Sequence, residues 1–229
     1  MKLGDRIKRY EAATRYLATQ RMPLIVRVDG RAFHTFTKGM ERPFDAKLMS
    51  AMVESAKEVA KDMQGFKVAY VQSDEVTFCL TDYDSLETQG WFDYNLQKVI
   101  SISAAMMSVN LIKQLGTDEL PVFDSRAFNV PIDDVVNTFL WRAKDWERNS
   151  LQMYSRAFFS HNELHGKKRS DMHEMLHKAG KNWATDLTMQ EKNGAFILSH
   201  NEGLEVRHDI EPRHEAIKDS MWHLISGAL

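Results

Sequence analysis

Hydrophobic and polar positions change their period several times along the chain, and each change marks a new predicted element. Short apolar runs predict strands at 23–29 and 122–130 and a hairpin at 66–80. Apolar residues at helical spacing predict three helices, at 5–20, at about 43–64 and at 91–115. Asp45 is placed to cap the second of these helices, and Gly65 to end it.

The order strand, helix, strand, strand, helix, strand is typical of a ferredoxin-like split βαβ unit, with one sheet and two helices on one face. We therefore expect an α+β fold. Beyond residue 132 the pattern is helical almost to the end, apart from a short strand predicted at 195–198. We divide the chain into residues 1–132, a ferredoxin-like domain with an N-terminal helix, and residues 133–229, a mainly helical C-terminal extension packed on it.

Composition narrows the class of protein without naming a partner. Hydrophobic residues make up 43% of the 229 and charged residues 27%, as is ordinary for a soluble globular protein. Lys and Arg number 30 against 32 Asp and Glu, so any contact with RNA must come from local patches. One cysteine, no membrane-length apolar run and no signal-peptide core predict a cytoplasmic protein without a membrane partner.

Two acidic motifs stand where predicted strands end. Asp29 closes the first strand and is followed by Gly30, which lets the backbone turn sharply. Asp74 and Glu75 occupy the corner of the hairpin. In the split βαβ topology the first strand neighbours the second strand of that hairpin, so these carboxylates can meet at one sheet edge. Converging carboxylates can hold two Mg²⁺ ions for phosphoryl transfer, as in the palm of nucleotide polymerases. The alternative is ordinary turn chemistry, which also favours Asp, Ser and Gly.

Five segments together carry a more specific pattern that covers nearly the whole chain. They are Val26-Arg27-Val28-Asp29-Gly30-Arg31-Ala32-Phe33-His34 with Gln72-Ser73-Asp74-Glu75, then Arg42-Pro43-Phe44-Asp45, then Phe123-Asp124-Ser125-Arg126, and finally Trp141-Arg142 with Asp145. This set resembles the tRNA-His guanylyltransferase family, and in particular its bacterial, archaeal and phage guanylyltransferase-like branch.

The resemblance implies a polymerase/cyclase-type palm in residues 1–132 and a 3′–5′ nucleotidyltransferase activity. It implies that Asp29, Asp74 and the Gly30 carbonyl bind two Mg²⁺ ions and that Glu75 supports catalysis at the same site. ATP would activate the 5′ phosphate of tRNA by adenylylation. The 3′-hydroxyl of GTP or another nucleoside triphosphate would then attack, and AMP or pyrophosphate would leave. Members of the family are commonly homotetramers, so we expect a dimer of dimers.

Cations and polar groups near the first strand are expected to bind the nucleotide. The predicted nucleotide-binding residues are Arg27, Arg31, Ala32, Phe33, His34, Arg42, Ser73 and Asp74. Arg27 lies within an otherwise apolar strand, so we expect it to have an anionic partner. The alternative for the loop cations is simple solvation.

Two later segments are candidates for RNA contact. Glu147-Arg148-Asn149-Ser150 resembles the guanylyltransferase-like branch, whereas eukaryotic guanylyltransferases carry His-Ile-Asn-Asn-Leu-Tyr at this place. The resemblance therefore favours template-dependent repair of 5′-truncated tRNA over anticodon-dependent recognition of tRNA-His, which stays the alternative. The predicted RNA-binding residues are Arg148 and Asn149, with the basic run Lys167, Lys168 and Arg169. A helix junction and a solvated charged face are the structural alternatives.

One motif predicts chemistry of another class. His173-Glu174-Met175-Leu176-His177 matches H-E-x-x-H, which on a helix can present two imidazoles to Zn²⁺ in a metallopeptidase. The alternative is an amphipathic helix with Met172, Met175 and Leu176 inward. A non-catalytic RNA-binding module and a palm-type nucleotide cyclase are further alternatives.

Overall fold

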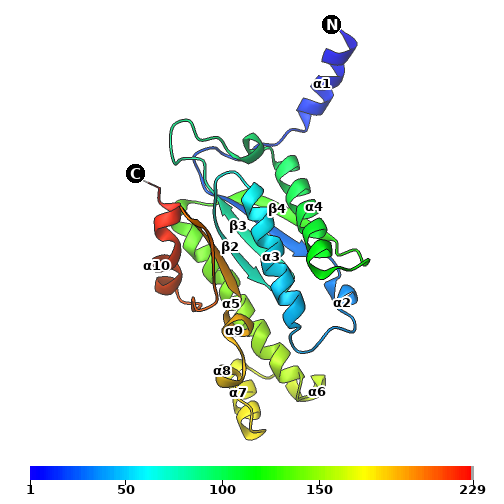
Figure 1. The fold of residues 1–229 in the computed structure, drawn as a ribbon, viewed down its shortest axis with the longest axis vertical. Helices are drawn as coiled ribbons and strands as arrows, with labels where there is room; N and C mark the ends of the chain where they lie inside the picture. The colour runs from blue at the N-terminus through cyan, green and yellow to red at the C-terminus, as the bar shows by residue number, and fades with distance from the viewer. Residues whose placement is uncertain (228–229) are drawn as a thin grey trace.

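The computed structural model describes residues 1–227, and one six-stranded antiparallel sheet organises this part of the chain (Figure 1). The strands lie in the order β4-β1-β3-β2-β5-β6. Their bounds are β1 (Leu24–Gly30), β2 (Phe66–Gln72), β3 (Glu75–Leu80), β4 (Phe123–Asn129), β5 (Ala195–His200) and β6 (Gly203–Arg207). The first four strands have the ferredoxin-like order, so the expected α+β class is confirmed.

Helices cover both faces of the sheet. Figure 1 shows α3 and α4 on one face and α5 with α10 on the other, while α1 projects away from the body. The helices are α1 (Leu3–Ala13), α2 (Phe33–Phe36), α3 (Ala46–Asp62), η1 (Trp91–Tyr94), α4 (Leu96–Leu115), α5 (Ile132–Arg156), α6 (His161–Leu164), α7 (Arg169–Lys178), α8 (Trp183–Asp186), α9 (Met189–Asn193) and α10 (His214–Ile225). In the part that the structure describes, none of them is long and apolar enough to cross a membrane.

Strand β1 serves two hydrophobic cores through the alternation of its side chains. Leu24, Val26 and Val28 belong to the core beneath α3 and α4, whereas Ile25 belongs to the core beneath α5 and α10. Arg27 and Asp29 continue the series that starts with Ile25. The polar side chains of β1 therefore lie on the face that α5 partly covers.

The predicted helix bounds are partly confirmed. Asp45 caps α3 as expected, because its carboxylate accepts a hydrogen bond from the Leu48 N–H at 2.8 Å. The helix predicted at 91–115 begins only at Leu96. Residues 92–94 have positive φ angles, and the Asn95 side chain caps α4 by accepting from the Lys98 N–H. The helix predicted at 5–20 ends earlier, at Ala13.

The C-terminal part contributes more strand than the sequence predicts. The strand expected at 195–198 is present as β5, but β6 stands where helix was expected. The β5–β6 hairpin extends the sheet because β5 pairs with β2, for example Val68 with Leu198. Strand β6 has only five residues and no fully buried side chain, so its apolar signal is weak. The division of the chain into residues 1–132 and 133–229 stays a prediction.

Candidate active site

Asp29 and Asp74 come together where β1 ends and where β2 turns into β3. Asp29 pairs directly with Glu75 across the β1–β3 ladder. The Gly30 N–H donates to the Asp74 carbonyl at 3.0 Å and ties the strand end to the turn. Ser73 shapes that turn with a φ of 47°, which is uncommon for a residue with a side chain. The predicted convergence of the two acidic motifs is therefore present.

Gly30 is required by the way the chain approaches itself. A Cβ atom at this position would lie 2.3 Å from the Phe33 ring. That ring is buried, and its centroid lies 5.0 Å from those of Phe36 and Phe123. The aromatic cluster thus fixes the strand exit beside Asp29. Because the Phe33 side chain is enclosed, only its backbone could touch a nucleotide.

The two carboxylates are partly buried and lack a cationic partner. Burial raises the pKa of Asp29, and the negative charge of Asp124 raises it further. Burial is also the main cause that raises the pKa of Asp74, with a contribution from the Asp29 charge. Neither carboxylate has an ion pair within residues 1–227. A cation between them would remove this electrostatic cost.

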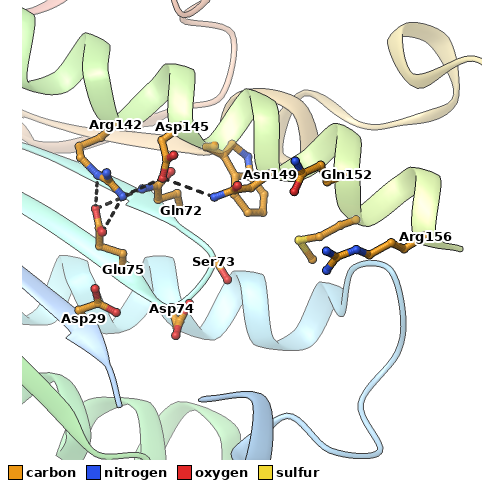
Figure 2. A pocket seen from close by; sticks show the side chains of 12 residues that line it. Asp29, Gln72, Ser73, Asp74, Glu75, Arg142, Asp145, Asn149, Gln152 and Arg156 are labelled. Carbon is orange, nitrogen blue, oxygen red and sulfur yellow. Dashed lines mark hydrogen bonds and ion pairs between the residues drawn. The ribbon is translucent and has the colours of Figure 1, made fainter. Parts of the chain in front are cut away.

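Glu75 has a different environment, because it faces α5. Its carboxylate accepts from Arg142 Nε at 2.6 Å and from Arg142 Nη2 at 2.7 Å, and the Gln72 amide donates to it at 3.1 Å. Arg142 also donates to Asp145 at 3.1 Å. Figure 2 shows Asp29 and Asp74 on the side of Glu75 that faces away from Arg142. Glu75 is therefore held in a buried ion pair with α5, and its role in catalysis stays a prediction.

A cavity of about 280 Å³ opens beside the carboxylates (Figure 2). Asp29 and Asp74 stand on one wall, and α5 supplies Asn149, Gln152 and Arg156 on the other. A second cavity of about 330 Å³ shares Ser73, Trp146, Met153 and Arg156 with the first. Small-molecule sites typically measure about 300–1,000 Å³, so the two together have the size of a nucleotide site.

The residues present fit a divalent cation that binds through oxygen. The candidate ligands are the carboxylates of Asp29 and Asp74 and the Gly30 carbonyl, all of them hard donors of the kind that Mg²⁺ prefers. Within residues 1–227 no group of three or more Asp, Glu, His or Cys side chains could hold a metal ion. The remaining ligands would therefore come from water and from substrate phosphates, as is common for Mg²⁺.

The predicted nucleotide-binding residues separate into two groups. His34, Arg42 and Ser73 line the second cavity, and Ser73 and Asp74 also line the first. The other four, Arg27, Arg31, Ala32 and Phe33, line neither of these cavities. The anionic partner expected for Arg27 is absent from the described chain, and its guanidinium lies 5.4 Å from the centroid of the Trp141 ring instead.

The predicted RNA-binding residues also differ in their surroundings. Asn149 lines the cavity, while the exposed Arg148 pairs with Asp145. Arg169 is held by Glu147 through two hydrogen bonds of 2.7 and 2.8 Å. Lys167 and Lys168 are exposed. Among the five predicted RNA-binding residues, the two arginines are in ion pairs, whereas Lys167 and Lys168 have none within residues 1–227. The RNA-binding role of the whole set stays a prediction.

The H-E-x-x-H segment lies on α7 in the arrangement of an amphipathic helix. Met172 and Leu176 are buried, and Met175 is half-buried. The His173 ring packs edge-on against Trp183, and Glu174 pairs with Lys178 at 2.6 Å. The glutamate that would serve as a general base is thus engaged by a lysine.

Sequence reasoning missed Gln152 and Arg156 of the α5 wall and gave Arg142 and Asp145 no role in the site. Five polar residues recur every three or four positions along this helix: Arg142, Asp145, Asn149, Gln152 and Arg156. Val135, Val136, Phe139 and Ala143 form an adjoining apolar stripe and are buried. The regular spacing of these polar residues was the signal available in the sequence. Polar residues three or four positions apart lie on one face of a helix, as apolar residues at that spacing do.

Comparisons with known proteins identify the family of the chain. A family model for tRNAHis guanylyltransferase matches residues 4–131, which is more than half of the chain. The tRNA(His) guanylyltransferase of Debaryomyces hansenii is 32% identical over 179 residues, which cover 68% of this chain and 65% of that protein. The chain thus spans just under two thirds of that relative's length.

Two solved bacterial structures are similar over nearly the whole chain. A bacterial tRNA(His) guanylyltransferase-like protein in complex with ATP has a TM-score of 0.86 and 41% identity, covering 91% of this chain and 92% of that one. A second, in complex with GTP, has a TM-score of 0.82 and 36% identity, covering 95% and 97%. The family model and the 32% identity to the Debaryomyces hansenii protein show that the chain belongs to the tRNAHis guanylyltransferase family of nucleotidyltransferases.

Proposed function

We propose that this protein adds nucleotides in the 3′–5′ direction to the 5′ end of tRNA, choosing each one by pairing with the opposite strand. The family supports the transferase chemistry, and the bacterial relatives solved with ATP and with GTP support the two nucleotide substrates. The observation that carries the proposal is the Gly30 N–H···Asp74 carbonyl bond, which fixes the carboxylates of Asp29 and Asp74 beside two joined cavities that together have the size of a nucleotide site.

Asp29, Asp74 and the Gly30 carbonyl would hold two Mg²⁺ ions. Such ions neutralise charge that develops on the attacking and leaving oxygens of a phosphoryl transfer. The chain itself fixes the carboxylates of Asp29 and Asp74 near the ends of neighbouring strands. It also holds the Glu75 carboxylate in an ion pair with Arg142. Positioning and charge neutralisation supply most of the catalysis in reactions of this type.

The two joined cavities would hold the nucleoside triphosphate. His34 of α2, Arg42 on the α2–α3 connection and Arg156 on α5 give it cationic or proton-donating walls. Ser73 lies between the two cavities, where its hydroxyl can donate to a phosphate oxygen. Asn149 and Gln152 supply amides that can hydrogen-bond a base or a ribose.

Template-dependent repair is favoured over addition restricted to tRNA-His because of the α5 sequence. Glu147-Arg148-Asn149-Ser150 stands in place of the eukaryotic His-Ile-Asn-Asn segment. In this protein Glu147 binds Arg169 of α7, and Ser150 accepts from the Trp183 indole at 3.0 Å. This segment therefore helps to dock α7 and α8 onto α5, in addition to lining the cavity through Asn149.

The deciding experiment uses 5′-monophosphorylated tRNA that lacks its first nucleotide, with Mg²⁺, ATP and all four nucleoside triphosphates. Products are read on a sequencing gel. We expect extension by the nucleotide that matches the template position, and a changed template base should change the added nucleotide. Addition of guanosine regardless of the template, and only to tRNA with the histidine anticodon, would favour the tRNA-His-specific activity. No extension of the truncated tRNA or of tRNA with the histidine anticodon would refute the proposal.

A further inference from the structure

Arg27 is a cation without an anion. No carboxylate within residues 1–227 lies in ion-pair distance of its guanidinium, and its buried Nε has no hydrogen-bond partner. Its contact is the Trp141 ring, whose centroid is 5.4 Å from the guanidinium carbon. A partly buried guanidinium normally satisfies its donors, so an unpaired one beside a reaction centre indicates a missing anionic ligand.

A second arginine stands directly beside it. Arg126 of β4 is the cross-strand partner of Arg27, and paired residues project from the same face of a sheet. Like charges in paired positions are mutually repulsive. Arg126 is relieved by Asp124, which accepts from it at 3.0 Å, but half of the Arg126 side chain remains exposed. An anion in contact with both guanidiniums would offset the repulsion.

Exposed aromatic rings complete the same surface. Trp141 on α5 is 55% exposed, although its ring also contacts Arg142 at 4.5 Å. Phe128 of β4 is 38% exposed and pairs with Ile25, which places it on the same sheet face as Arg27 and Arg126. We call Arg27, Arg126, Phe128 and Trp141 the β1–β4 shelf. Cations interleaved with exposed aromatic rings are typical of surfaces that bind single-stranded nucleic acid.

The shelf is separate from the proposed nucleotide site. None of its four residues lines either of the cavities beside the carboxylates. Arg27 nevertheless stands two residues before Asp29 on one strand face, a separation of about 7 Å. Its charge is felt at Asp29, whose carboxylate it favours in the ionised form. An RNA whose 5′ end reaches Asp29 could therefore lay its adjoining backbone on the shelf.

We propose that the β1–β4 shelf binds the 5′-terminal nucleotides of the RNA substrate, with Arg27 and Arg126 holding backbone phosphates and Trp141 contacting a base or a ribose. This proposal rests on the proposed function, since it assigns the place of the RNA strand at that same site. It transfers Arg27 from the nucleoside triphosphate to the RNA. Asp124 on the same face marks the end of the shelf nearest the metal ligands.

The test measures RNA binding without chemistry. The full-length protein is titrated, in EDTA and without nucleotides, into 3′-labelled, 5′-monophosphorylated tRNA lacking its first nucleotide, and fluorescence anisotropy gives Kd. We expect Trp141→Ala to raise Kd about tenfold and Trp141→Phe to raise it less, because an aromatic face remains. Arg27→Gln should raise Kd and lower the slope of log K against log salt by about one phosphate contact.

Lys218→Ala is the matched control, because Lys218 is an exposed cation that lies 5.4 Å from the Trp222 ring on α10, outside the shelf. Its Kd should equal that of the wild type, and thermal unfolding verifies that each variant is folded. Wild-type Kd and salt slope in Arg27→Gln and Trp141→Ala would overturn the shelf and leave the proposed function standing. In a separate titration with ATP, loss of ATP binding by Arg27→Gln while its RNA binding stays intact would also overturn the shelf. A wild-type protein that binds no RNA would refute the proposed function itself.

Discussion

Glu75 and Arg142 are joined by two hydrogen bonds, of 2.6 and 2.7 Å, which connect strand β3 to helix α5 across the edge of the candidate site. Each side chain is only 10% exposed. The pair therefore sets the position of the α5 wall relative to the carboxylates of Asp29 and Asp74. It also keeps one acidic side chain of the cluster from competing for a cation.

Breaking this ion pair from one side should be costly. Arg142→Met leaves the Glu75 carboxylate buried without its partner, and we expect a loss of about 3–5 kcal/mol in the free energy of unfolding. Glu75→Gln, which leaves Arg142 uncompensated, should lose a similar amount. The double variant should lose clearly less than the sum of the two, as urea unfolding followed by circular dichroism can show. Strictly additive losses would contradict the pairing. Lys178→Ala, which breaks an exposed pair with Glu174, should cost less than about 1 kcal/mol and serves as control.

Asp74 should destabilise the metal-free protein at neutral pH. Its folded-state pKa is raised by burial, so the native state binds the proton more tightly than the unfolded chain does. The cost is present above both pKa values and disappears as the pH falls below the unfolded value near ~3.9. In EDTA at pH 7, Asp74→Asn should raise the Tm by on the order of 1–3 °C, and the gain should vanish near pH ~3.5. Mg²⁺ should raise the Tm of the wild type and not of the variant. An unchanged wild-type Tm in Mg²⁺ would contradict the metal assignment.

Removal of either proposed metal ligand should abolish nucleotide addition. Asp29→Ala and Asp74→Ala each remove several kcal/mol of transition-state stabilisation, so kcat should fall by about 10³-fold or more. Both variants should retain the wild-type circular dichroism spectrum, because neither carboxylate has an ion pair within residues 1–227. Single-turnover addition on the truncated tRNA measures the effect. Substantial activity in both variants would exclude these carboxylates as the metal ligands.

The H-E-x-x-H segment should have no part in activity. His177 is exposed on α7, and Glu174 is engaged by Lys178. We expect His177→Ala to leave nucleotide addition and the Tm unchanged, with an effect on the free energy of unfolding within about 0.5 kcal/mol. Elemental analysis of the purified protein should find no stoichiometric zinc. One zinc per chain that disappears in His177→Ala would revive the metallopeptidase alternative.

The assembly expected from the family is a dimer of dimers. Light scattering coupled to gel filtration should give about four times the chain mass of 26.5 kDa, and the mass should persist on dilution. The measurement is best made at several protein concentrations, because mass action separates a stable tetramer from a weak one. A concentration-independent monomer would show that this member of the family works alone.

The sequence predicted the first half of the molecule well because local patterns decide it. The alternation in β1, the cap at Asp45 and the acidic corner at Asp74 are each specified by neighbouring residues. The convergence of Asp29 and Asp74 then followed from the ferredoxin-like order of the strands. A strand's neighbours in this topology are fixed by chain order, so a distance in space could be inferred from positions in sequence.

The missing parts depend on contacts that no local pattern encodes. The sequence around Arg142 does not indicate that it pairs with Glu75, because the two residues are 67 positions apart. Arg27 was expected to have an anionic partner, and within the described residues its contact is the Trp141 ring. Strand β6 gains its place by pairing with β5 rather than through apolar character of its own. The start of α4 was set too early because positive φ angles at residues 92–94 are invisible to hydrophobic periodicity.

The pairing of β2 with β5 has a consequence for synthesis on the ribosome. Val68 can pair with Leu198 only after Leu198 has been synthesised, so more than half of the chain is made before β5 can cover the β2 edge. At about 5–20 residues per second, this edge stays open for on the order of ten seconds. During that time β2, whose residues are almost all destined for burial, can pair with other nascent chains. Translation speed across the second half of the message is therefore expected to influence how much of this protein reaches its folded state.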